Sequence, residues 1–180
     1  MTVHSGLTAD RFRAVLGHFC TGVAVVTAPG PVGFACQSFA ALSLDPPLVL
    51  FCAGRSARSL PLIRQAGVFA VNMLAEDQQG LSTVFGRSGP DKFAGVAWNP
   101  AGSGSPLLAG VLTWVDCEVR AEHDAGDHVI VVGEVRELGP VSDGRPLLFY
   151  RGRYAATDGG GESPGHLDSV FTWSRPTDWM

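Results

Sequence analysis

The chain has 180 residues, of which 46% are hydrophobic and 17% charged, and its formal net charge is -4. One domain of this length buries about 70% of the surface that its unfolded chain exposes, and a mildly acidic chain without a basic stripe argues against nucleic-acid binding. No apolar run approaches the roughly 20 residues of a membrane span, and residues 1–9 are polar and carry no signal peptide, so we expect a cytoplasmic protein that enters no membrane.

The first helix is predicted by a capping residue and an apolar face. Thr8 is a suitable N-cap and Gly22 a suitable end. The apolar face consists of Phe12, Val15, Leu16 and Phe19. The segments that follow are a strand over 23–28, a turn over 29–31, a strand over 32–39, a break at 45–47 and a fully apolar strand over 48–53.

The rest of the chain alternates between short helices and strands. Gly67 is expected to stop a short helix. The middle segments are that helix over 59–66, a strand over 68–74, a helix over 76–85 and a loop over 86–100. The strongest strand signal is the alternation of apolar and charged residues over 115–122, with a turn at 124–127, a partner strand over 128–138 and a last strand over 146–154.

Many short strands and few helices predict a mainly β protein with an antiparallel, barrel-like sheet, whose closure removes exposed edges. We expect one domain over residues 1–157. Three glycines at 159–161 are expected to form a flexible joint, and the tail over 158–180 holds three large aromatic residues, Phe171, Trp173 and Trp179. A tail this apolar is expected to dock on its own domain or on a second subunit.

Several common catalytic motifs are absent. The sequence contains no GxGxxG, P-loop, GxSxG or HExxH, which argues against a Rossmann-type dehydrogenase, an α/β-hydrolase and a zinc enzyme. The five histidines have no metal-ligand spacing. The four cysteines, Cys20, Cys36, Cys52 and Cys117, form no CxxC pair and sit among apolar residues, so we expect buried thiols in a reducing cytosol, with no disulfide and no metal site.

The segment from Gly33 to Pro47 carries a specific resemblance. Its sequence, GFACQSFAALSLDPP, resembles the signature of the short-chain flavin reductases, which are the reductase components of two-component flavin-dependent monooxygenases. Further matches occur in family order at 21–23, 71–74, 77–78, 91–93, 126–128 and 146–152. The resemblance covers essentially the whole chain and is strongest to the actinobacterial branch that serves the hydroxylase of steroid-derived phenols.

This resemblance implies an FMN-binding split β-barrel, antiparallel and Greek-key-like, in a homodimer with the flavin near the subunit interface. It implies NADH or NADPH as donor, FAD or FMN as acceptor, and a partner flavin-dependent monooxygenase that acts on an aromatic or phenolic substrate. Ala35, Gln37 and Ala41 stand where much of the wider family has Thr, Asn and Ser, side chains that help to hold the flavin. The choice between FAD and FMN therefore stays open.

A flavin needs a slot for its flat ring, N–H donors for its polar edge and a positive or N–H-rich site for its phosphate. The small residues within 36–43 allow a backbone to approach such a ring closely. In this segment the resemblance implies flavin contacts from Cys36, Gln37, Ser38, Phe39, Ala40, Leu42 and Ser43. The alternative is a half-buried strand and turn that binds nothing.

The phosphate is expected where a strand ends and a helix begins, because a helix start offers free N–H groups and a favourable dipole. The residues implied there are Cys52, Ala53, Gly54 and Ser59. Phe85, Gly86 and Lys92, with Arg87 beside them, would add ring contact and positive charge. The alternatives are a plain N-cap at Ser59 and a solvated basic pair in a loop.

His128, which begins a strand after a tight turn, is the candidate catalytic residue. The resemblance places it beside the nicotinamide, where its role would be positioning and electrostatics, because hydride transfer needs no general base. Tyr150 and Arg151 are implied as cofactor contacts, and Asp178 and Trp179 of the tail are expected to cover the nicotinamide pocket. The alternatives are a surface histidine at a strand end and ordinary strand residues.

Three other functions stay open on the sequence. They are a non-catalytic flavin- or haem-binding protein of the same barrel class, an oxidase that retains its flavin or uses a deazaflavin, and a dimeric barrel that only scaffolds a partner. The run Gly126-Asp127-His128 argues against the first of these.

Overall fold

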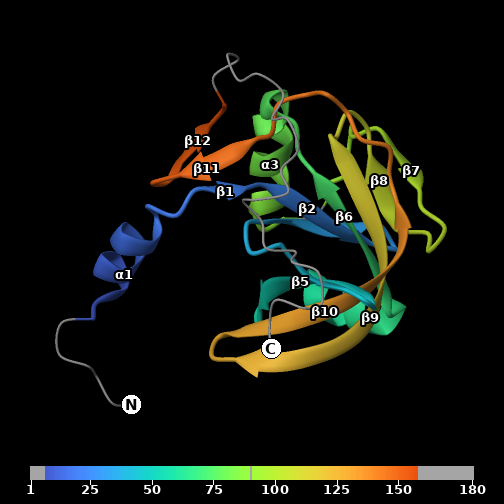
Figure 1. The fold of residues 1–180 in the computed structure, drawn as a ribbon, viewed down its shortest axis with the longest axis horizontal. Helices are drawn as coiled ribbons and strands as arrows, with labels where there is room; N and C mark the ends of the chain where they lie inside the picture. Colours follow the sequence, from blue (N-terminus) through green and yellow to red (C-terminus); the bar gives the residue numbers. More distant parts are fainter. Residues whose placement is uncertain (1–6, 90, 158–180) are drawn as a thin grey trace.

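An antiparallel sheet of seven strands forms the body of the protein (Figure 1). The computed structural model describes residues 7–89 and 91–157, so the predictions for the tail, including Asp178 and Trp179, lie outside the described residues. The strands of the sheet are β2 (Ala24–Ala28), β3 (Val32–Cys36), β4 (Ala40–Leu44), β5 (Pro47–Gly54), β6 (Val68–Met73), β9 (Thr113–Ala125) and β10 (His128–Leu138). Their order is β3-β2-β6-β9-β10-β5-β4, which confirms the predicted antiparallel, mainly β fold with short helices.

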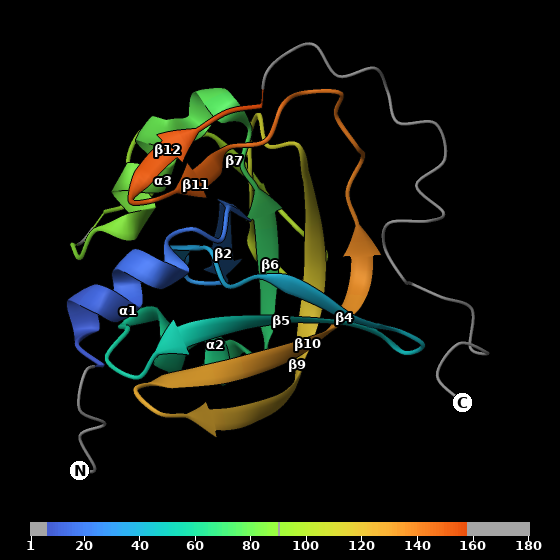
Figure 2. The ribbon, with the colours of Figure 1, turned by 60° about the vertical axis from the view of Figure 1, so that its left-hand side comes forward.

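The sheet curls until its two outer strands approach each other, as can be followed in Figure 2. In a flat sheet, seven strands about 4.8 Å apart would separate β3 from β4 by about 29 Å. These two strands are joined only by residues 37–39, which span at most about 14 Å. Ser38 completes the closure, because its hydroxyl accepts a hydrogen bond from the Cys52 N–H at 2.9 Å and donates to the Cys52 carbonyl at 3.2 Å.

Two hydrophobic clusters lie on opposite faces of β2, whose five residues are all buried. Successive side chains of a strand point to opposite faces, so Val26 joins the cluster inside the curl and Val25 joins the one outside it. Inside, the rings of Phe51 and Phe69 pack edge to face with centroids 5.0 Å apart. The outer cluster contains Val23, Val25, Leu74, Phe85, Leu108 and Leu147.

Helix α2 (Ser59–Ala66) has the predicted bounds and ends at Gly67, whose φ of 67° is the left-handed conformation that glycine adopts readily. It buries Leu60 and Ile63 against the inner cluster. Its N-cap is Arg58, so the alternative of Ser59 as a plain N-cap is wrong; Ser59 is the first helical residue and is buried. The predicted helix over 76–85 is present as the 3-10 turn η1 (Glu76–Gln78) followed by α3 (Gln79–Gly86).

Several short strands were not foreseen. The strand expected over 32–39 ends at Cys36, and β4 follows it. The hairpin of β7 (Trp98–Pro100) and β8 (Pro106–Leu108) begins within the expected loop. Buried Asn72 holds this hairpin, accepting from the Leu108 N–H at 2.8 Å and donating to the Pro106 carbonyl at 3.2 Å. Sequence patterns could not reveal these strands because their pairing depends on such distant contacts.

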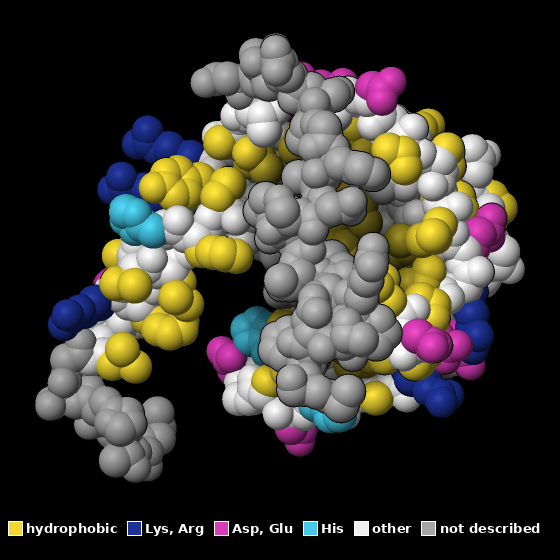
Figure 3. All heavy atoms as spheres, in the orientation of Figure 1, with side chains coloured by type: hydrophobic (Ala, Val, Ile, Leu, Met, Phe, Trp, Pro, Cys, Tyr) yellow, Lys and Arg dark blue, Asp and Glu magenta, His cyan; other side chains and the backbone are white. Residues whose placement is uncertain are grey.

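A three-stranded sheet carries the N-terminal helix. It consists of β1 (Thr21–Gly22), β11 (Leu148–Tyr150) and β12 (Arg153–Ala155), so the single strand expected over 146–154 is two strands joined by a turn. Helix α1 (Ala9–Leu16) ends at Gly17 and not at Gly22. None of its residues is buried, and Figure 3 shows hydrophobic side chains standing out along it. Phe12, Val15, Leu16 and the following Phe19 are between 51% and 78% exposed.

Two sequence expectations about burial are corrected. The four cysteines are free, but Cys20 is exposed and Cys52 partly so, while Cys36 and Cys117 are buried as expected. The predicted alternation of apolar and charged residues on β9 does not give Asp116 an exposed position: it is buried, and its carboxylate accepts hydrogen bonds from the N–H and the hydroxyl of Ser103, at 3.0 Å and 2.6 Å.

Candidate functional site

A cavity of about 690 Å³, here called the main cavity, lies between three segments that are far apart in the sequence. They are the β2–β3 turn with β3 (30–35), the β5–α2 turn with the start of α2 (54–62), and the end of α3 with the loop after it (85–93). Predicted site residues that line it are Gly54, Ser59, Phe85, Gly86 and Lys92. Of the residues expected near a phosphate, Gly54 and Ser59 line the main cavity, and Cys52 and Ala53 do not.

The charged lining of the main cavity is mostly positive. It contains Arg58, Arg87 and Lys92 against the single acid Asp91. Within residues 7–89 and 91–157, neither Arg58 nor Arg87 forms an ion pair, whereas six other arginines bind carboxylates. The N-terminus of α2 also faces this cavity and adds backbone N–H groups and the positive end of a helix dipole. Such a lining suits an anionic ligand.

Lys92 is held by carbonyl groups. Its ammonium donates to the Phe85 carbonyl at 3.0 Å, near the C-terminal end of α3, and to the Gly33 carbonyl at 3.2 Å. Partial burial lowers the pKa of Lys92. The alternative of a merely solvated loop lysine is therefore wrong for Lys92, which fastens the loop over 87–93 to α3 and β3.

The walls of the main cavity combine aromatic rings with glycines. Phe34, Phe85 and Phe93 line it, and the rings of Phe85 and Phe93 meet edge to face with centroids 5.0 Å apart. A Cβ atom at Gly33 would lie 2.9 Å from Cε1 of Phe85 and 2.9 Å from the Val26 carbonyl oxygen, so only glycine fits there. Phe85 and Gly33 are themselves buried, so the apolar wall that a ligand can reach comes from the partly exposed rings of Phe34 and Phe93.

His128 is not among the residues that line the main cavity, but it lies beside one of them. It is the first residue of β10 and is paired with Gly54 of β5, which lines the cavity. Its Nδ1 atom lies 2.7 Å from Oδ1 of Asp127, and this hydrogen bond and the imidazole charge lower the pKa of Asp127. The other ring nitrogen, Nε2, lies on the side of Gly54. The ring is about half exposed, so a ligand can reach it.

The segment over 36–43, whose flavin contacts stay a prediction, lies outside the lining of the main cavity. Ser38 uses its hydroxyl for Cys52, and burial raises the pKa of the Cys36 thiol. Ala40 and Leu42 lie exposed and Ser43 half-buried on the edge strand β4. None of the residues over 36–43 is among those that line the main cavity.

Two further cavities adjoin the main one along this segment. The second, of about 400 Å³, shares Ala35, Gly86 and Arg87 with the main cavity and is also lined by Cys36 and Gln37. The third, of about 520 Å³, shares Gln37 with the second and includes Phe39. Residues 35–39 therefore run beside three cavities. The main cavity is lined by three cationic residues, the second by Arg87 alone and the third by none.

Other predicted site residues lie elsewhere. Tyr150 contacts His18, with the hydroxyl 3.5 Å from Nδ1, and Arg151 donates its backbone N–H to the Gly17 carbonyl at 2.8 Å. Neither lines any of the three cavities. Both support the junction with α1. Cys52 and Ala53 lie on β5 before Gly54, and Ala53 is buried in the inner cluster.

Arg58 and Gly33 are among the residues of the main cavity that sequence reasoning missed. Arg58 carried a usable signal, since it is a basic residue immediately before a predicted helix. Gly33 carried none, because its need for glycine arises from the ring of Phe85, a residue 52 positions later in the chain.

Along residues 7–89 and 91–157, no helix is both long and apolar enough to cross a membrane. The same part of the chain contains no group of three or more His, Cys, Asp or Glu side chains that would hold a metal ion.

Comparison with known proteins identifies the fold and its relatives. Residues 16–158 match the family model described as the flavin reductase like domain. The chain is 51% identical over 178 residues to the reductase subunit HsaB of a flavin-dependent monooxygenase from Mycobacterium tuberculosis. The alignment covers 94% of this chain and 95% of that protein.

Two solved structures extend the likeness. Nitrilotriacetate monooxygenase component B from Mycobacterium thermoresistibile matches with a TM-score of 0.84 and 49% identity, over 91% of this chain and 96% of that one. The NADH:FAD oxidoreductase SgcE6 from Streptomyces globisporus, solved with NAD and FAD fragments, matches with a TM-score of 0.82 and 34% identity, over 85% of this chain and 94% of that one. These likenesses confirm the split-barrel fold.

Proposed function

This chain belongs to the flavin reductase family, and on that premise we propose that it transfers a hydride from NADH to free FAD or FMN and releases the reduced flavin to a flavin-dependent monooxygenase. NADH becomes NAD⁺ in this reaction, and the flavin takes up the hydride together with one proton from solvent. NADH is preferred as the donor because a relative of the chain is named an FMN reductase (NADH) and SgcE6 is named an NADH:FAD oxidoreductase.

The observation that carries this proposal is the lining of the main cavity. Arg58 and Arg87 bring two guanidinium groups without ion-pair partners in the described ranges, and the α2 N-terminus faces the same space. These groups are suited to the phosphates of a flavin nucleotide. The partly exposed rings of Phe34 and Phe93 offer apolar surface for the flavin ring.

His128 is proposed to position the nicotinamide at the edge of this cavity. Its ring is fixed from one side by Asp127, which leaves Nε2 on the side of Gly54. Hydride transfer needs alignment of the two rings and exclusion of water more than a proton-transferring group. The role of His128 is therefore orientation, and its loss should affect nicotinamide binding more than the chemical step.

The exposed rim of the main cavity supports release of the flavin as a product. Ser56, Gly86, Arg87, Ser88 and Asp91 line the cavity and are exposed. A ligand held at such an open site exchanges with solvent more readily than one sealed in a core. This distinguishes the proposal from an oxidase that retains its flavin.

A homodimer is proposed from the exposed apolar face of α1. Four large apolar side chains on and just after one short helix are about half exposed or more in a single copy of the chain. Apolar patches of this kind commonly mark protein–protein interfaces. The predicted cover of the nicotinamide pocket by Asp178 and Trp179 is retained as a proposal for the tail over 158–180.

The proposed function is tested by mixing the purified protein with NADH and following the nicotinamide absorbance with and without added FAD or FMN. We expect rapid oxidation of NADH only when flavin is present, slower oxidation of NADPH, and loss of the flavin on gel filtration. Flavin that stays with the protein through gel filtration would favour the oxidase, and absence of NADH oxidation with either flavin would favour a non-catalytic binding protein.

A further inference from the structure

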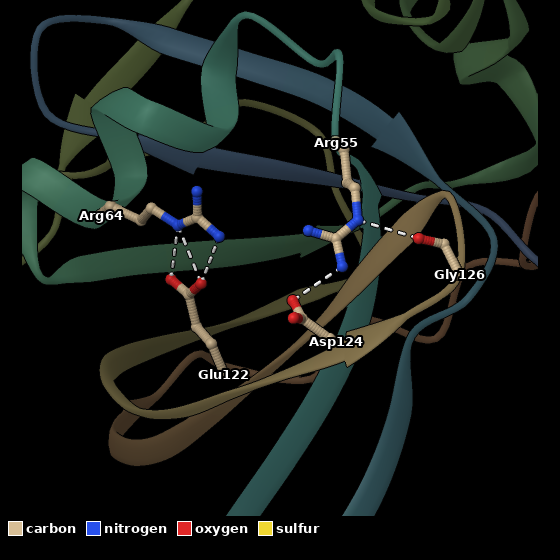
Figure 4. A network of polar contacts seen from close by, with 5 residues as sticks. All are labelled: Arg55, Arg64, Glu122, Asp124 and Gly126. Atoms are coloured by element: carbon tan, nitrogen blue, oxygen red, sulfur yellow. Dashed lines mark hydrogen bonds and ion pairs between the residues drawn. The ribbon is translucent and has the colours of Figure 1, made fainter.

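Arg55 binds three residues that lie shortly before His128, and Figure 4 shows two of these contacts, with Asp124 and Gly126. Its backbone N–H donates to the Asp127 carbonyl at 3.0 Å, and its Nε donates to the Gly126 carbonyl at 2.8 Å. The same guanidinium forms an ion pair with Asp124, with NH2 2.8 Å from Oδ1. One residue thus engages both a carboxylate and two carbonyl groups on the β9–β10 turn.

The position of Arg55 in the chain gives these contacts a consequence for the site. The residue before it, Gly54, lines the main cavity and is paired with His128. The residues after it, from Ser56 to Ser59, line the same cavity and lead into α2, which begins at Ser59. Arg55 therefore joins the segment suited to bind phosphate to the turn that carries the candidate nicotinamide contact.

The turn has little other support. It consists of Gly126 and Asp127, and the side chain of Asp127 is 94% exposed. Gly126 has a φ of 65° and no neighbour within contact distance of a Cβ atom. Without the Arg55 guanidinium, the turn would lose two of its contacts with the β5–α2 segment.

We propose that Arg55 is a positioning residue, which fixes the β9–β10 turn against the β5–α2 turn and so sets the place of the His128 ring at the edge of the main cavity. This inference rests on the proposed role of His128 in nicotinamide binding. Arg55 is not among the residues that line the cavity, so it acts through the turn and not on the ligand.

Arg64 supplies a matched control. It lies on α2 and forms a bidentate ion pair with Glu122 of the same hairpin, with distances of 2.6 Å and 2.8 Å to Oε2 (Figure 4). Its side chain is 45% exposed, against 46% for Arg55. Both arginines tie β9 to the same part of the molecule, but only Arg55 reaches the turn before His128.

The first test is steady-state kinetics of Arg55→Ala and Arg64→Ala with NADH and FAD. Arg55→Ala should raise the KM for NADH about threefold to tenfold, the loss expected for one weakened hydrogen bond, and leave kcat within about twofold. The KM for NADH of Arg55→Lys should lie between the values of wild type and Arg55→Ala, because an ammonium can reach these acceptors but lacks the planar guanidinium that binds several of them at once. Arg64→Ala should leave the KM for NADH unchanged, and an equal rise in both alanine variants would overturn the inference.

The second test separates the role of Arg55 from the role of His128. If Arg55 acts through His128, Arg55→Ala should add nothing to the KM for NADH in a His128→Ala background. The NMR signals of the His128 ring, assigned by their loss in His128→Ala, should shift in Arg55→Ala and stay in place in Arg64→Ala. An additive increase in KM, or ring signals unmoved by Arg55→Ala, would refute the positioning role.

The two hypotheses fail in different ways. If His128→Ala leaves the KM for NADH unchanged, the proposed nicotinamide role of His128 is wrong, while the ring signals still report whether Arg55 sets its position. If His128→Ala raises that KM and Arg55→Ala does not, the proposed function stands and the inference about Arg55 is wrong.

Discussion

His128 lies directly opposite Gly54 in the pairing of β10 with β5, and its Nε2 atom is 3.9 Å from the position that a Cβ atom would take at residue 54. That distance is an ordinary contact, so Gly54→Ala should retain near-normal kinetics. Gly54→Val, a larger but strand-compatible residue, should displace the ring and raise the KM for NADH about fivefold to tenfold. Kinetics beside thermal unfolding would check this, and equal behaviour of the two variants would show that the ring position is unimportant.

The arginines of the main cavity should govern flavin affinity. Because hydrogen bonds to charged groups contribute about 1.5–3 kcal/mol, Arg58→Ala and Arg87→Ala should each weaken flavin binding by about tenfold to a hundredfold. Titration of flavin fluorescence measures this. Arg136→Ala is the control, because this substitution removes the same positive charge at a residue that binds Glu118 and Glu134 on the β9–β10 hairpin and does not line the main cavity. A similar loss in Arg136→Ala would mean that only net charge matters.

The cysteines should differ in reactivity because their environments differ. Burial, with a smaller contribution from neighbouring Asp116, raises the pKa of Cys117 to about 12, and burial also raises the pKa of Cys36. A raised pKa keeps the thiol protonated, so at about pH 8 only about one Cys117 in ten thousand is a thiolate. Iodoacetamide and mass spectrometry should therefore find exposed Cys20 modified first in the native protein. Equal labelling of Cys117 without denaturant would contradict the packing described here.

Gly133 should be intolerant of any side chain. A Cβ atom there would lie 2.7 Å from Cε1 of Phe69 and 3.1 Å from the Cβ of Cys117, both inside the curled sheet. Gly133→Ala should therefore lower the free energy of unfolding by about 1–3 kcal/mol, the usual cost of overpacking. In Gly80→Ala, by contrast, the new methyl group meets open space on α3, and stability should rise by up to about 1 kcal/mol. Urea unfolding of both variants measures the difference.

The exposed face of α1 predicts a dimer that charge can break. A Phe12→Glu, Val15→Glu double variant places two carboxylates on that face and should halve the mass measured by light scattering. Arg13→Glu, on the same helix at a side chain 78% exposed, is the control and should remain dimeric. A wild-type protein that is monomeric at micromolar concentration would contradict the proposed homodimer.

Elements with strong local signals were predictable. Helix α2 has its predicted bounds because an apolar face and Gly67 define it, and β10 runs over the predicted 128–138. By contrast, β4, β7 and β8 are each five residues or shorter and depend on distant partners, among them β5 and Asn72. The end of α1 was misplaced because Gly17 precedes the glycine expected to stop the helix.

Some features of the candidate site were likewise predictable from the sequence, and others were not. Gly54, Ser59, Phe85, Gly86 and Lys92 come from separate segments, and the fold places all five around the main cavity. The family pattern could indicate such residues. It could not indicate that the Ser38 hydroxyl is hydrogen-bonded to the Cys52 backbone or that the Tyr150 hydroxyl lies beside the His18 ring. Those outcomes depend on the closure of the sheet and on the placement of α1, which no local pattern specifies.

The central claim is that the main cavity, between β3, the start of α2 and the end of α3, receives the flavin. Diffraction from crystals soaked with FAD tests it most directly. We predict density for the flavin phosphates beside Arg58 and Arg87, with His128 at the edge of the occupied space. Flavin density confined to the third cavity, beside Phe19 and Leu112, or no bound flavin at saturating concentration, would contradict the account.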